Sequence, residues 1–106
     1  MAEVPGDGPT WVWGAATLPD AAGREHLVAA AVKVRGNMEA YRWDLVEWDA
    51  AAARFRPLRT LWQKSAAAPK PTIVPDGHAL RWTDGQGTAW LLFCNPFPTL
   101  RCPATY

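Results

Sequence analysis

The sequence contains few of the residues on which common catalytic and cofactor sites depend. Its single Ser, Ser65, stands in a stretch of Ala and Pro and lacks the surroundings of a nucleophile elbow. Two Cys and two His are too few and too scattered to form a four-ligand metal site. Gly85 and Gly87 do not lead into a helix, so they do not indicate a phosphate-binding loop. We therefore expect no metal and no other cofactor.

The sequence also lacks an excess of charge of either sign. Eleven Lys and Arg residues nearly balance ten Asp and Glu residues, which leaves a net charge of +1. The basic residues are scattered and form no run. Nucleic acids and anionic membranes are bound largely through clustered positive charge. We therefore predict no nucleic-acid partner and no membrane partner.

Long hydrophobic runs are missing as well. No segment approaches the ~20 apolar residues that a membrane-crossing helix needs. The N-terminus has no basic start followed by an apolar stretch, so it does not read as a signal peptide. A cytoplasmic protein is the default expectation if Met1 is the true start of the protein. Cys94 and Cys102 can then face each other across a hairpin, as a disulfide in some registers or as two small buried side chains.

What the chain does contain is apolar material and an internal repeat. Hydrophobic residues make up 49% of its 106 residues and seven of them are Trp, which indicates one folded domain. The segment DAAG at residues 20–23 matches DGQG at residues 84–87, sixty-four positions later. Each segment separates two apolar runs, the pattern of a β-hairpin. A repeat of this length is typical of stacked or radially arranged sheets.

Apolar runs and turn residues divide the chain into four parts. Residues 1–10, with two Gly and two Pro, are expected to form a flexible lead-in. Residues 11–62 are expected to form a four-stranded meander, residues 63–77 a connection rich in Pro and Ala, and residues 78–106 a partial second meander. The strands are expected at residues 11–18, 26–34, 41–48, 54–62, 78–83, 88–94 and 99–103.

Residues 38–55 allow two interpretations. Apolar residues recur there at three- and four-residue spacing, and Asn37 suits the N-cap of a helix, so one interpretation is an amphipathic helix in an α+β fold. The other is a hairpin that turns at Asp49 and the four Ala residues after it. Because consecutive strands tend to pair, we predict the hairpin and an all-β chain.

Three segments carry a family resemblance. WTDGQGTAWLLF at residues 82–93, LVEWD at 45–49 and FRPL at 55–58 are similar to hairpins in the β-propellers of glycosidase-type carbohydrate-active enzymes. The resemblance covers roughly residues 11–106 and implies one complete and one partial blade, as in a fragment of a propeller. A self-contained β-sandwich or small barrel and the α+β domain are the alternatives. Two blades cannot close a ring, so exposed sheet edges imply self-association.

The resemblance also implies a ligand-binding face. In a propeller the innermost strand begins at the face where ligands usually bind, and the loop between the second and third strands opens there too. Applied to this chain, the rule gathers Trp11, Trp13, Asn37, His78, Asn95 and Arg101. Aromatic rings with polar groups nearby suit a carbohydrate ligand. The alternative is that both Trp side chains pack in the core, while His78 and Asn95 serve as turn residues.

Catalysis of glycoside hydrolysis would need two carboxylates, ~5–5.5 Å apart for retention or ~6.5–9.5 Å apart for inversion. Asp44 and Glu47 are three residues apart, so on a strand they face opposite sides. Glu39 alone lies in the expected ligand-side loop and is the candidate catalytic residue. The sequence thus predicts a carbohydrate-active or carbohydrate-binding protein without a complete active site in this chain. The competing class is a non-catalytic interaction module that buries its Trp-rich sheets against a partner.

Overall fold

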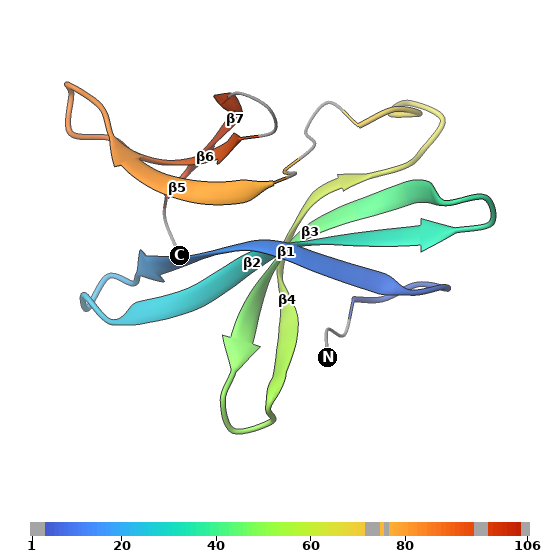
Figure 1. Cartoon of the computed structure of the whole chain (residues 1–106), viewed down its shortest axis with the longest axis horizontal. Helices are drawn as coiled ribbons and strands as arrows, with labels where there is room; N and C mark the ends of the chain where they lie inside the picture. Colours follow the sequence, from blue (N-terminus) through green and yellow to red (C-terminus); the bar gives the residue numbers. More distant parts are fainter. Residues whose placement is uncertain (1–3, 72–74, 76, 95–97, 105–106) are drawn as a thin grey trace.

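The computed structural model describes residues 4–71, 75, 77–94 and 98–104, and these residues form strands, turns and loops without a helix (Figure 1). Two antiparallel sheets are present, one of four strands in the order β1-β2-β3-β4 and one of three strands in the order β5-β6-β7. The strands are β1 (Thr10–Pro19), β2 (Glu25–Arg35), β3 (Glu39–Asp49), β4 (Arg54–Gln63), β5 (His78–Thr83), β6 (Ala89–Cys94) and β7 (Pro98–Pro103). The all-β prediction is confirmed, and both sheets are meanders.

The helical alternative for residues 38–55 is wrong. Those residues form β3, a turn and the start of β4. Along β3 the side chains of Trp43 and Leu45 enter one apolar cluster while that of Val46 enters another, which is the two-residue alternation of a strand. The Ala run turns because the Asp49 carboxylate accepts hydrogen bonds from the backbone N–H groups two and three residues ahead, at 3.0 and 3.1 Å.

The repeated segments form two turns with the same hydrogen bonds. In each turn the Asp Oδ1 atom, of Asp20 or of Asp84, accepts from the backbone N–H groups two and four residues ahead at 2.9–3.0 Å. Three residues after the Asp, Gly23 and Gly87 adopt φ values of 78° and 81°, which favour glycine. The short pattern therefore specifies one turn structure twice.

The equivalence extends into the strands on both sides of each turn. A shift of 64 residues carries every cross-strand pair next to the first turn onto a cross-strand pair next to the second. The first set is Ala16 opposite Val28, Thr17 opposite Leu27, Leu18 opposite His26 and Pro19 opposite Glu25; the second is Leu80 opposite Leu92, Arg81 opposite Leu91, Trp82 opposite Trp90 and Thr83 opposite Ala89. The two hairpins thus share register as well as turn geometry.

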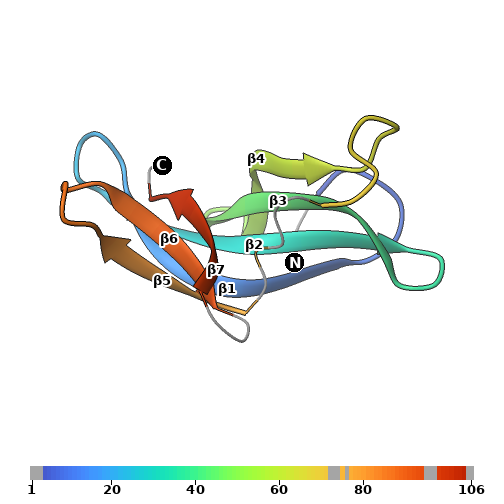
Figure 2. The ribbon, with the colours of Figure 1, turned by 90° about the horizontal axis from the view of Figure 1, so that it is seen from above.

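The two sheets pack face to face, and the main core lies between them (Figure 2). We call the two facing surfaces the inner faces. Leu18 and Val28 on the inner face of the four-stranded sheet are at most 1% exposed, as are Leu91 and Phe93 on the inner face of the three-stranded sheet.

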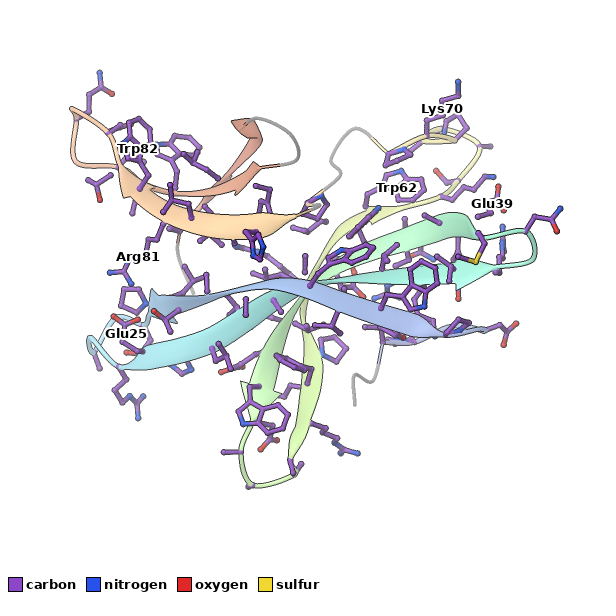
Figure 3. The ribbon with its side chains drawn as sticks, in the orientation of Figure 1. Glu25, Glu39, Trp62, Lys70, Arg81 and Trp82 are labelled. Carbon is purple, nitrogen blue, oxygen red and sulfur yellow. The ribbon has the colours of Figure 1, made fainter. Side chains whose placement is uncertain are left out.

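At the edge of this contact β5 runs beside β1 in the same direction (Figure 1). The Arg81 guanidinium donates to the Thr17 backbone carbonyl at 3.3 Å and forms an ion pair with Glu25 at 3.3 Å. Figure 3 shows Arg81 on the side of β5 that faces Glu25. The first strands of the two meanders are therefore neighbours.

The outer face of the four-stranded sheet is covered in part by the lead-in. Val4 is 7% exposed and packs in a cluster formed by Ala29, Ala31 and Val46. Two further contacts hold residues 4–9, since the Gly8 carbonyl accepts from the Lys33 ammonium and the Asp7 carbonyl accepts from the Tyr41 hydroxyl. The lead-in thus contacts both β2 and β3. In the part of the chain that the structure describes, no helix is long and apolar enough to cross a membrane.

Candidate ligand-binding face

Three Trp side chains form a row on the inner face of the four-stranded sheet. The Trp13 ring centroid lies 6.1 Å from that of Trp11 and 6.2 Å from that of Trp43, with interplanar angles of 68° and 31°. Trp43 is 4% exposed, whereas Trp13 is 38% exposed. The tryptophan row (Trp11, Trp13, Trp43) thus has a buried base and a partly exposed indole. Such a surface can stack on the apolar face of a ligand.

The segment that begins β5 passes close to β1 next to this row. Gly14 has a φ of 67°, and the register of β1 and β2 shifts between Trp13 and Ala16. A Cβ atom on Gly14 would lie 2.5 Å from the Gly77 carbonyl oxygen, so only glycine allows the two backbones to approach this closely. The backbone on either side of exposed His78 therefore lies next to Gly14, the residue that follows Trp13. Alternation along β5 places the His78 side chain on the face that also carries Leu80 and Trp82.

The structure does not bring Asn37 to the tryptophan row. Asn37 lies exposed in the turn between β2 and β3. Trp13 is paired with Ala30 on β2, and Ala30 precedes Asn37 by seven residues. At ~3.3 Å per residue, Asn37 therefore lies roughly 20 Å from the position of Trp13. Asn95 lies outside the described residues. For Arg101 the structure gives a backbone position opposite Leu92, and its side chain lies outside the described part.

Glu39, the candidate catalytic residue, begins β3 at the same turn, far from Glu25 and Arg81 (Figure 3). Its carboxylate accepts hydrogen bonds from the Lys64 ammonium and from Arg35 Nε. The hydrogen bond from Lys64 lowers the pKa of Glu39 below its usual value. A carboxylate stabilised in its charged form is poorly suited to act as a general acid at neutral pH.

A cleft of about 320 Å³ lies where the lead-in meets the turn between β2 and β3. Residues 7–9 form one side, and residues 34–36 together with Met38 form the other. The Arg35 guanidinium carbon stands 4.8 Å from the centre of the Tyr41 ring close by. Sequence reasoning did not find this cleft because it depends on a contact between the lead-in and a distant hairpin, for which no local pattern exists.

Two carboxylates, those of Glu47 and Asp20, surround the His26 ring. Its Nδ1 atom lies 2.7 Å from Glu47 Oε1, and its Nε2 atom lies 2.9 Å from Asp20 Oδ2. Only an imidazolium can donate to both carboxylates at once. The hydrogen bond to Asp20, together with Glu47, raises the pKa of His26, and the same bond lowers the pKa of Asp20. Glu47 also pairs with Arg56 at 3.0 Å, so this network ties the first turn to β3 and β4.

Asp44 and Glu47 lie on opposite faces of β3, as strand alternation requires. Asp44 is fully buried, and its Oδ2 atom accepts from Arg42 Nε at 2.8 Å. Its Oδ1 atom has no hydrogen-bond partner among the residues that the structure describes. Asp20, Glu39, Asp44 and Glu47 are thus each held by basic side chains. Asp20 and Glu47 come together on the His26 ring, and their ion pairs engage the two carboxylates that a glycosidase would need to keep available.

Among the described residues no group of three or more His, Cys, Asp or Glu side chains has the arrangement of a metal site. Comparison of the chain with models of known protein families, with curated proteins and with solved structures gave no match. The geometry of the tryptophan row is therefore the main evidence for function.

Proposed function

We propose that this chain is a carbohydrate-binding unit of β-propeller type and that the tryptophan row is its ligand-binding surface. The observation that carries the proposal is Trp13, which is 38% exposed although it is fixed between Trp11 and Trp43. A large indole held rigidly at the surface can stack on a sugar ring with little loss of side-chain freedom. The Gly77 carbonyl, which approaches Gly14 next to the row, supplies a polar group near the same surface.

The arrangement of the sheets supports the propeller part of the proposal. Blades are antiparallel meanders, usually of four strands, set around a common axis. The two sheets are meanders, their first hairpins share one register, and their first strands β1 and β5 run side by side in the same direction (Figure 1). The sheet of β1–β4 corresponds to a complete blade and that of β5–β7 to a partial one.

The proposal is binding without hydrolysis by the described residues. Hydrolysis requires one carboxyl group that can donate a proton and a second that can act as nucleophile or base. The Glu39 carboxylate is held by Lys64 and Arg35, and the Glu47 carboxylate is held by His26 and Arg56. These ion pairs favour the charged forms and serve the fold.

The experiment is a calorimetric titration with soluble cello-, xylo-, manno- and malto-oligosaccharides. We expect one of these series to bind, and Trp13→Ala to weaken that binding at least about tenfold, a loss of about 1.4 kcal/mol. Trp48→Ala is the matched control, because Trp48 is 37% exposed and lies on the outer face of the same sheet. Equal binding by a folded Trp13→Ala variant and the wild type would refute the proposed site, and binding of none of the four series would refute the function.

A further inference from the structure

The outer face of the three-stranded sheet exposes large apolar side chains. Leu80 is 55% exposed and Trp82 is 43% exposed. Their cross-strand partners Leu92 and Trp90 are half-buried and share this face. Figure 3 shows Trp82 on the side of β5 away from β1, opposite to the side from which Arg81 reaches the other sheet.

The internal repeat identifies what kind of surface this is. A shift of 64 residues carries Leu18 onto Trp82 and Val28 onto Leu92, in the same cross-strand register. Leu18 is 0% exposed and Val28 is 1% exposed, because the three-stranded sheet packs on them. The positions that another sheet covers in the first hairpin are therefore uncovered in the second.

The opposite side of the molecule presents the complementary half of the same contact. Leu91, which packs against the core from the three-stranded sheet, is equivalent to Leu27 in the repeat. Leu27 lies on the outer face of the four-stranded sheet and is 40% exposed. Trp48 is 37% exposed on the same face. Its neighbour Glu47 is paired with Val28, so Trp48 on β3 lies beside Leu27 on β2. The Val4 cluster leaves both side chains accessible.

We propose that a second copy of this chain docks here head to tail. The outer face of the three-stranded sheet of one copy, with Leu80 and Trp82, packs against the outer face of the four-stranded sheet of the next, with Leu27 and Trp48. The contact uses two different surfaces, so a dimer formed this way still presents one free surface of each kind. Further copies can add until a ring closes, and the stacking of sheets within one chain continues between chains. This proposal concerns the faces of the sheets and does not depend on carbohydrate binding.

Sedimentation velocity over a micromolar to millimolar concentration series, without oligosaccharide, tests the proposal. We expect the mean mass of the wild type to rise with concentration beyond that of a dimer or to stop at a closed ring. Leu80→Glu and Leu27→Glu each remove one of the two surfaces and should each give a monomer. An equimolar mixture of these two variants retains one intact surface of each kind and should give a dimer that does not grow. Met38→Glu is the control, because Met38 is 64% exposed in the turn between β2 and β3.

Three results would overturn the proposal. The first is a wild type that stays monomeric over the whole series, which would leave these faces to some other partner. The second is association that Leu80→Glu abolishes and Leu27→Glu leaves intact, which would indicate a symmetric contact through one face. The third is failure of the two folded variants to associate when they are mixed. Circular dichroism checks folding, and Leu80→Ser with Leu27→Ser gives a milder pair if either Glu variant unfolds.

Discussion

Replacing Phe93 by Ala is expected to destabilise the protein strongly, because this ring joins the two sheets. Phe93 is 1% exposed and lies in the core formed by both inner faces. Truncation of a buried Phe costs about 3–5 kcal/mol, through lost burial and the cavity that remains. Single domains are stable by only ~5–15 kcal/mol, so the loss is a large part of the total. At ~4–8 °C per kcal/mol, the melting temperature should fall by roughly 12 °C or more.

The assay is urea denaturation followed by Trp fluorescence, with Leu80→Ala as the matched control. Leu80 belongs to the same sheet but is 55% exposed on its outer face. Full burial of a Leu is worth ~1.5–3 kcal/mol, so truncation of this half-exposed side chain should cost about 1 kcal/mol. Both variants are measured at a dilution at which the protein is monomeric. A cost below about 1 kcal/mol for Phe93→Ala, or a cost equal to that of the control, would refute the packing of one sheet on the other.

Two further predictions concern stability. Because Asp20 and Glu47 raise the pKa of His26, its ion pairs stabilise the fold fully below the ordinary His value of 6.5 and lose this effect as the pH rises through the raised pKa. The lowered pKa of Asp20 adds stability above its ordinary value of 3.8, so the contribution of the network should be largest between pH 3.8 and 6.5. Urea denaturation should therefore show a His26→Gln penalty that shrinks by pH 8, and a penalty that grows toward pH 8 would contradict the network. Gly14→Ala should cost about 2 kcal/mol or more in the same assay, because it combines a positive φ with a backbone clash. Gly36→Ala is the control, because Gly36 also has a positive φ but has open space where a Cβ atom would lie. An equal cost for the two variants would contradict the close approach of the backbones at Gly14.

The strands could be predicted from the sequence because their signals are local. Alternation and turn chemistry act over a few residues, and the strand expected at residues 41–48 lies within β3 (Glu39–Asp49). The turns at Asp20 and Asp84 are short-range as well, since each Asp bonds to backbone within four residues. The helical pattern of residues 38–55 was misleading because its apolar residues belong to different elements. Met38 and Ala52 lie in turns, whereas Leu45 on β3 and Phe55 on β4 contribute to two different apolar clusters.

The candidate site could be predicted only in part. Trp11 and Trp13 share one face because they are two residues apart on one strand, a relation that the sequence contains. The passage of the backbone around His78 beside Gly14 is a tertiary contact, which no local pattern in the sequence contains. Asn37 is separated from Trp13 by the second half of β2. The propeller rule assigned the whole loop after β2 to the ligand-binding face, and it did not take this distance into account. The hydrogen bond from Lys64 to Glu39 likewise joins β3 to the connection that follows β4.

The most direct test of the proposed function is an NMR titration that follows the indole N–H signals of the seven Trp residues. Each Trp gives one such signal, so the protein reports by itself which indole a ligand contacts. On addition of the oligosaccharide series that binds by calorimetry, we predict that the signals of Trp11 and Trp13 shift with ligand concentration while those of Trp48 and Trp82 stay in place. Shifts confined to Trp48 or Trp82, or no shift at ligand saturation, would contradict binding at the tryptophan row.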